Sequence, residues 1–205
     1  MRLKSTDKNV KQRILRCAEL LFTEKGYSNT SVRDVCRYAN ANIALVNYYF
    51  NSKEELYKEL IKSKTKPIIK KLKEVCDNKE IAPKEKFYLL FSIYEDFYRV
   101  NYHLPQLIAR EIVTNTEISR WFHKNIIAKE LKLVKKIFEV AQKNNVITNR
   151  YDAVTLMNFS MGAMMFILAG STMTRKVLGR EFVIKGNIKD KIEKIKDLLM
   201  NGIKN

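Results

Sequence analysis

The side chains that best combine a chemical role with a suitable position lie between residues 42 and 53. Asn47 stands in an almost uncharged run from Ile43 to Tyr49, and its amide offers both a hydrogen-bond donor and an acceptor. Lys53 opens the next helical stretch, where its charge and the free backbone N–H groups attract an anion. Tyr48 is expected to be an exposed aromatic beside this helix start. The alternative for each is an ordinary solvated side chain, and that alternative is weakest for Tyr48 and Lys53.

The sequence offers no constellation for catalysis or metal binding. His103 and His123 have no partner at metal-ligand spacing, and no nucleophile–base pair or phosphate-binding loop is recognisable. The cysteines (Cys17, Cys36 and Cys76) are odd in number and widely spaced, which favours reduced core thiols in a cytosolic protein. We therefore expect neither an enzyme nor a metal or cofactor site.

Two short helices and a tight turn would position residues 42–53. Ser31 and Asp34 have capping-box spacing at the start of the first helix. Asn40-Ala41-Asn42 then breaks the apolar pattern with residues that tolerate turn geometry, and Asn42 can cap the second helix. Ser52-Lys-Glu-Glu55 has capping-box spacing for a third helix. Short helices joined by such a turn form a helix-turn-helix, whose second helix enters a DNA major groove.

The run from Ile14 to Tyr57 resembles the DNA-binding head of the tetracycline-repressor (TetR) family of bacterial regulators. The turn usually reads Ala-Gly-Val-Ser in that family and is Ala39-Asn40-Ala41-Asn42 here, but Asn tolerates the left-handed backbone that Gly supplies. The resemblance implies an all-α fold of about nine helices. Residues 1–56 would form the DNA-binding head, and residues 57–205 a helical body for effector binding and dimerisation. The matching segments are Ile14-Leu15, Ala18, Leu21-Phe22, Gly26-Tyr27, Thr30 to Val35, Ala39 to Val46, Tyr48 to Phe50 and Ser52 to Tyr57.

Carried over position by position, the resemblance implies two sets of DNA contacts. Small apolar groups on the second helix can meet a thymine methyl, while Asn47 can discriminate adenine. Val46 and Phe50 are instead expected to hold this helix against Leu21 and Phe22. The residues facing the bases would be Asn42, Ile43, Ala44, Leu45 and Asn47, and those touching phosphates Ser31, Arg33, Tyr48 and Lys53.

Net charge agrees with DNA binding but does not locate it. The formal charge is +17, of which residues 1–66 contribute +7 and the remainder +10. Residues 1–9 are polar and basic, so they could be a disordered tail or an arm that reaches DNA. The first helix is expected from Val10 to Lys25, ended by Gly26 in a left-handed conformation.

The body contains an aromatic stripe that fits either a plain core or the wall of a ligand pocket. Its members follow steps of three and four residues, at Phe87, Phe91, Tyr94, Tyr98 and Tyr102. If a pocket forms, we expect it to take a mostly apolar or aromatic molecule. The residues predicted to bound it are Tyr94, Tyr98, Trp121, Phe159 and Met165.

The last two expected helices, 150–172 and 188–203, carry apolar seams that predict a dimer. Exposed on a single chain, these seams would form a large apolar surface, whereas a two-fold axis would bury them in a four-helix bundle. The seams are Met157-Met161-Met164 and Ile192-Ile195-Leu199. These seams predict a homodimer. The cysteine pattern and the lack of an apolar run long enough to span a bilayer predict a cytoplasmic protein.

The resemblance implies a regulator that binds a palindromic DNA operator and is released when a small molecule binds the body. Binding requires the two recognition helices to lie about 34–36 Å apart, and a ligand that favours another spacing lowers operator affinity. Two other classes remain open at this point. An α-helical enzyme lacks a recognisable site, and a nucleoid-type structural DNA binder would explain the charge but not the long aromatic and Met-rich body.

Overall fold

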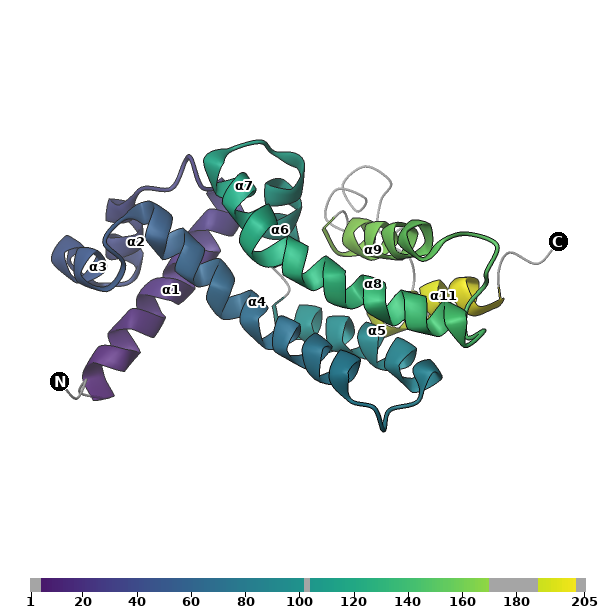
Figure 1. Cartoon of the computed structure of the whole chain (residues 1–205). Helices are drawn as coiled ribbons and strands as arrows, with labels where there is room; N and C mark the ends of the chain where they lie inside the picture. The colour runs from purple at the N-terminus through teal and green to yellow at the C-terminus, as the bar shows by residue number, and fades with distance from the viewer. Residues whose placement is uncertain (1–4, 102–103, 170–187, 202–205) are drawn as a thin grey trace. The chain divides into compact units, whose positions relative to one another are not determined.

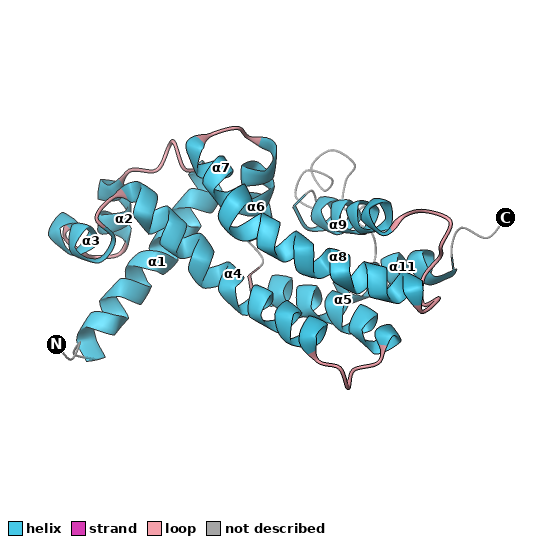
Figure 2. Cartoon of the chain, in the orientation of Figure 1, coloured by secondary structure: helices cyan, strands magenta, loops and turns pink. Residues whose placement is uncertain are grey.

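The computed structural model of the chain describes residues 5–101, 104–169 and 188–201 (Figure 1). Every regular element in these ranges is a helix, which confirms the all-α prediction (Figure 2). Tyr102, His103 and the C-terminal part of the 150–172 helix lie outside the described residues. None of the described helices is both long and apolar enough to cross a membrane.

The chain divides into two compact units. One comprises residues 1–66 with 116–118, and the other residues 67–115 with 119–205. The division falls inside helix α4 (Lys53–Asp77), which continues through Pro67 at the first position of the second unit. The sequence-based boundary after residue 56 lies near the start of the same helix.

The first unit contains α1 (Ser5–Lys25), α2 (Val32–Tyr38), α3 (Ile43–Phe50) and the start of α4. Helix α1 begins earlier than predicted, so residues 5–9 are neither a tail nor an extended arm. Gly26 ends this helix with a φ of 81°, as its position predicted. The core of the unit is the apolar side of α1 together with one side of α3 and α4, and its members include Ile14, Ala18, Leu21, Phe22, Val46, Phe50 and Leu56.

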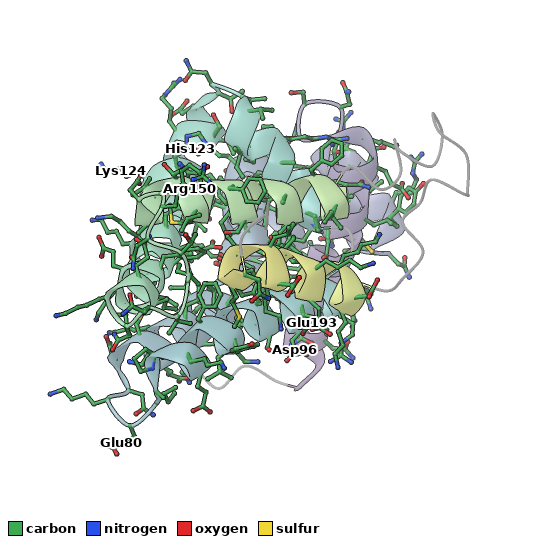
Figure 3. The ribbon with its side chains drawn as sticks, turned by 90° about the vertical axis from the view of Figure 1, so that its right-hand side faces the viewer. Glu80, Asp96, His123, Lys124, Arg150 and Glu193 are labelled. Carbon is green, nitrogen blue, oxygen red and sulfur yellow. The ribbon has the colours of Figure 1, made fainter. Side chains whose placement is uncertain are left out.

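The second unit is built around α5 (Pro83–Val100), α8 (Ala128–Lys143), α9 (Ala153–Ala169) and α11 (Ile188–Asn201). Helix α8 packs on α5 and α9, and α11 packs on the same two helices, so these four surround one core. Figure 3 shows α9 and α11 side by side. Pro83 opens α5, and the carboxylate of Asp152 accepts hydrogen bonds from the backbone N–H groups of Val154 and Thr155 in the first turn of α9.

The remaining elements of the second unit precede α8. Helix α6 (Leu104–Val113) packs against α9, and α7 (Glu117–Phe122) leads into a π-helical turn, His123–Ile127. The chain therefore continues from α7 into α8 through one widened turn. The aromatic stripe of α5 lies largely in the core, where Phe87, Phe91 and Tyr94 are fully buried.

The apolar seams of α9 and α11 face the core of their own chain, so the prediction that they would be exposed is wrong. Met157 and Met164 are buried, as are Ile192, Ile195 and Leu199. The exposed apolar side of α9 carries Phe159 and Phe166, with 56% and 63% of their surface accessible. A helix that is apolar nearly all round has two candidate faces, and its sequence does not say which one the chain itself covers.

Candidate nucleic-acid interface and effector site

Helix α3 has one buried and one exposed face. Val46 and Phe50 are buried, as predicted for residues that hold the helix in place. Ile43 is 48% exposed and Tyr48 is 65% exposed, an unusual position for side chains of this size. The residues predicted to face DNA lie on the accessible side, with Asn42, Ala44 and Asn47 exposed and Leu45 half-buried. The structure thus brings the predicted base readers onto one short helix surface.

Local hydrogen bonds fix the start of α2. Asp34 N–H donates to Ser31 Oγ at 3.1 Å, and Ser31 N–H donates to Asp34 Oδ2 at 3.2 Å, which confirms the capping box. The Ser31 hydroxyl also donates to Asp34 Oδ2 at 2.6 Å. These bonds from Ser31 hold the pKa of the Asp34 carboxyl below its usual value. Because the Ser31 hydroxyl proton already serves Asp34, its predicted phosphate contact requires this bond to rearrange.

The turn between α2 and α3 uses the two asparagines as expected. Asn40 adopts a left-handed φ of 43°, the conformation for which Asn substitutes for Gly. Asn42 caps α3, with its Oδ1 accepting from Leu45 N–H at 2.8 Å. The side-chain oxygen of Asn42 is therefore engaged within the protein, and its NH2 group is the part available to a base.

A residue that sequence reasoning missed fastens this turn to α1. Arg13 Nε donates to the carbonyl of Ala39 at 2.7 Å, and a terminal nitrogen of Arg13 donates to the carbonyl of Asn40 at 3.2 Å. The guanidinium thus bridges two successive carbonyls of the turn. The contact spans 26 residues of sequence, so no local pattern indicates it.

Arg13→Gln is expected to lower the free energy of unfolding of the first unit by about 1–2 kcal/mol, because it removes charge-assisted hydrogen bonds to backbone carbonyls. Arg16→Gln is the matched control, because Arg16 is exposed on the same helix. This change should alter the free energy of unfolding by less than about 0.5 kcal/mol. Chemical denaturation followed by circular dichroism measures both. Equal effects would show that the bridge contributes nothing to stability.

Lys53 opens α4, as predicted, and lies against the loop that follows α1. Its Nζ donates to the carbonyl of Ser28 at 3.4 Å and lies 4.3 Å from the centre of the Tyr27 ring. Partial burial lowers the pKa of this ammonium. The backbone N–H groups at the start of α4 are nearby, so the site has the components of an anion site. Arg33, predicted to touch phosphate as well, is exposed near the start of α2.

The predicted effector residues do not all come together. Tyr94 and Tyr98 on α5 are buried, and their rings stack with centres 6.1 Å apart and planes 20° apart. Trp121 and Met165 are half-buried. Phe159 is exposed on the outer side of α9, so the structure does not place it with the buried tyrosine pair.

Glu130 on α8 joins the tyrosine pair, and sequence reasoning missed it. The Tyr94 hydroxyl donates to Glu130 Oε1 at 2.5 Å. Burial raises the pKa of the Glu130 carboxyl, an effect that the hydrogen bond from Tyr94 opposes. Burial likewise raises the pKa of the Tyr94 and Tyr98 hydroxyls. The sequence held one signal for this residue, a lone charge on the inward stripe formed by Ile126, Glu130, Val134, Ile137 and Ala141.

No group of three or more potential metal ligands occurs in the parts of the chain that the structure describes. The free cysteines are partly or fully buried, and burial raises the pKa of the Cys36 and Cys76 thiols. Thiols in this condition are poor nucleophiles.

Comparison with known proteins gives matches over the head and over the whole fold. Residues 14–60 match the family model described as bacterial regulatory proteins, tetR family. The probable HTH-type transcriptional regulator YttP of Bacillus subtilis is 28% identical over 138 residues, which are 66% of each protein. The negative regulator of the biofilm operon icaADBC, IcaR of Staphylococcus aureus, is 36% identical over 53 residues, 26% of this chain and 28% of that protein. Each match therefore spans less than two thirds of the relative's length.

Among solved structures, the chain resembles the transcriptional regulator FadR of Bacillus subtilis in complex with stearoyl-CoA. The TM-score is 0.74 at 19% identity, and the alignment covers 94% of this chain and 99% of the other. At this identity the likeness concerns the fold, which extends through the body as well as the head.

Proposed function

We propose that the chain, whose residues 14–60 match the model of the tetR family of bacterial regulatory proteins, is a member of that family and a sequence-specific repressor of transcription that a small molecule releases from a palindromic operator. Residues 1–56 would form the DNA-binding domain and residues 57–205 the effector and dimerisation domain. A protein with this role acts in the cytoplasm, where bacterial DNA is accessible.

The proposal rests on α3, which has one buried face and one exposed face. Its inner side is buried, and its outer side presents Asn47 and small apolar groups to solvent without any charged side chain. A structural DNA binder needs cations on its contact surface but gains nothing from an exposed amide and methyl groups. The caps at Ser31 and Asn42 and the bridge from Arg13 hold this surface in a defined orientation.

Release by a small molecule is supported by the fold of the body and by α4. The body has far more helical structure than a support for a helix-turn-helix requires. Helix α4 belongs to both compact units, so any change in the body that moves its second half is transmitted along one helix. If an effector binds a body conformation that disfavours operator binding, the bound operator lowers the affinity for the effector by the same factor.

A homodimer is supported by the outer side of α9. Phe159 and Phe166 are exposed there, and a methyl group added to Gly162 between them would meet no described atom within 4 Å. Spacings of three and four residues place these positions on one face of the helix. Two copies related by a two-fold axis would bury this face, and would present two α3 helices to the two halves of a palindrome.

Selection of binding sites from a random DNA library tests the regulator directly. We expect enrichment of one two-fold symmetric sequence, bound at least about 1,000-fold more tightly than shuffled DNA of the same composition. Affinity measured at two salt concentrations separates specific from purely electrostatic binding. A library that yields no consensus, with similar affinity for all DNA, would instead indicate the nucleoid-type structural binder.

A further inference from the structure

The proposed function leaves part of the positive charge of the chain unexplained. Of the formal charge of +17, residues 67–205 carry +10, whereas the predicted phosphate contacts all lie in the head. Part of this charge lies on two segments of the body that are described throughout, α8 and the portion of α4 after Pro67. Their exposed side chains include eight lysines but three carboxylates. These lysines are Lys70, Lys71, Lys73, Lys129, Lys132, Lys135, Lys136 and Lys143.

The three carboxylates are already engaged with lysines of the same set. The ion pairs are Lys70–Glu74 at 3.7 Å, Lys135–Glu139 at 2.9 Å and Lys136–Asp77 at 3.3 Å. Within the described part of the chain, the other five lysines have no acidic partner. Unpaired like charges on neighbouring helices repel one another, so this surface attracts anions.

Helices α4 and α8 touch each other near the end of α4. The thiol of Cys76 donates a hydrogen bond to the carbonyl oxygen of Leu133, with 3.3 Å between sulfur and oxygen. The ion pair of Lys136 with Asp77 is half exposed on both sides, at 54% for each side chain. This pair therefore marks the line along which the outer sides of the two helices meet.

Three of the five remaining lysines lie on the same sides of the helices as this ion pair. Lys73 precedes Asp77 by four residues, and Lys132 and Lys129 precede Lys136 by four and seven. Residues at these spacings share one side of a helix. Both helices run from left to right in Figure 1, so the three lysines lie toward the same end of the contact. We call Lys73, Lys129 and Lys132 the lysine face.

The lysine face lacks the apolar side chains that fasten a protein partner or enter a membrane. None of the exposed large apolar side chains among the described residues lies on α8 or on α4 after Pro67. Protein interfaces depend on aromatic or aliphatic anchors, and helices that bind membranes insert an apolar side. The apolar sides of these two helices are instead buried in the core, for example at Leu72 and Val134. Charge is what this surface offers to a partner.

The phosphate backbone of nucleic acid is a partner for which charge is sufficient. Each phosphate that a lysine neutralises releases a counter-ion, and this release favours binding without any apolar contact. Neither α8 nor the portion of α4 after Pro67 contains arginine, whose bidentate group reads guanine. Lysine supplies a point charge on a flexible stem, which suits phosphates in any sequence. The surface is therefore suited to hold a duplex without recognising its bases.

We propose that the lysine face binds the phosphates of a second DNA duplex, without reading its sequence, while the DNA-binding heads hold the operator. This rests on the proposed function and goes beyond it by giving the body a nucleic-acid surface of its own. The protein would then bring two DNA segments together. DNA bound to the heads keeps further DNA at high local concentration, so a weak surface of this kind is sufficient.

Lysine acetylation tests which residues the second duplex covers. The full-length protein is saturated with the selected palindrome at low salt, and a duplex of random sequence is then added before acetic anhydride. We expect the second duplex to lower acetylation of the lysine face at least about threefold, because bound phosphates shield the ammonium groups. Exposed lysines elsewhere in the body are the reference and should react equally with and without it, namely Lys79, Lys84 and Lys189.

Capture on beads tests whether the protein joins two duplexes. Beads that carry the palindrome and the protein should retain a labelled random duplex. Combining Lys73→Gln, Lys129→Gln and Lys132→Gln should lower this retention at least about fivefold. The control variant replaces the three reference lysines by glutamine, which removes the same net charge, and should retain as much as the wild type. Affinity for the palindrome should stay unchanged in both variants and reports that they are folded.

No capture by the wild type, equal capture by the lysine-face variant, or an equal loss in the control variant would each overturn the proposal. Protection of the lysine face by vesicles of phosphatidylcholine and phosphatidylglycerol, but not by DNA, would indicate a membrane surface instead. Acetylation uses the wild type, so it decides even if the variant fails to fold. Site selection separates the two proposals: a consensus without capture removes only the second duplex, whereas capture on beads with an arbitrary duplex, without a consensus, removes the regulator.

Discussion

Replacing Phe159 and Phe166 together by glutamate is expected to give a folded monomer with greatly weakened operator binding. Both side chains are exposed on the outer side of α9, so charges there meet water in the single chain and oppose each other only in a dimer. A monomer binds one half-site at a time. In a dimer, by contrast, the second DNA-binding head is held close to its half-site once the first head has bound, which increases the affinity. This increase is about 100- to 10,000-fold.

Ile195→Glu is the matched contrast, because it adds the same charge to a residue that is 4% exposed in the core of the body. We expect it to lower the free energy of unfolding of the body by more than about 4 kcal/mol, since it buries an unpaired charge. Light scattering gives the oligomeric state and thermal unfolding gives the stability. If Ile195→Glu were instead a stable monomer, or the double phenylalanine variant a stable dimer, the interface would lie elsewhere.

Asn47→Ala and Lys53→Ala should weaken DNA binding in different ways. Removing the Asn47 amide is expected to weaken the selected palindrome by about 1–3 kcal/mol per half-site while leaving random DNA nearly unaffected. Removing the Lys53 charge should weaken both DNAs alike and make log K less steep in log[salt], by about 0.9 for each phosphate that the protein no longer neutralises. Lys70→Ala, at an exposed position on the second half of α4, controls for the removal of one positive charge.

A salt series on the palindrome and on random DNA distinguishes these outcomes. Equal loss of affinity on both DNAs for Asn47→Ala would mean that α3 does not read bases, and the proposal of a sequence-specific regulator would have to be withdrawn. A loss confined to the palindrome for Lys53→Ala would mean that this lysine contributes to recognition rather than to general attraction.

The sequence predicted well the features that depend on neighbouring residues. The Ser31–Asp34 capping box, the Asn42 cap, and the left-handed Gly26 and Asn40 each depend on a few adjacent residues, and the structure contains all of them. The resemblance likewise placed Val46 and Phe50 inside, and both are buried.

Features that depend on distant contacts were missed or misassigned. The bridge from Arg13 to the turn joins segments far apart in sequence, and the hydrogen bond from Tyr94 to Glu130 joins two different helices. Helix α9 is apolar on several faces, so its sequence could not tell the core side with Met157 from the outer side with Phe159. The same ambiguity led to Phe159 being placed in the effector pocket.

Pro67 interrupts the backbone hydrogen bonding of α4. Proline has no N–H to donate, so the carbonyl of Ser63, one turn earlier, lacks its usual helical bond at the place where the two compact units divide. We therefore expect α4 to bend more easily at Pro67 than elsewhere along its length. The part of α4 before Pro67 is about 20 Å long, so a bend of about 10° would move its far end by roughly 3–4 Å, a large fraction of the 5.4 Å pitch of a helix. On the proposed function, a small rearrangement in the body would then cause a larger displacement at the start of α4.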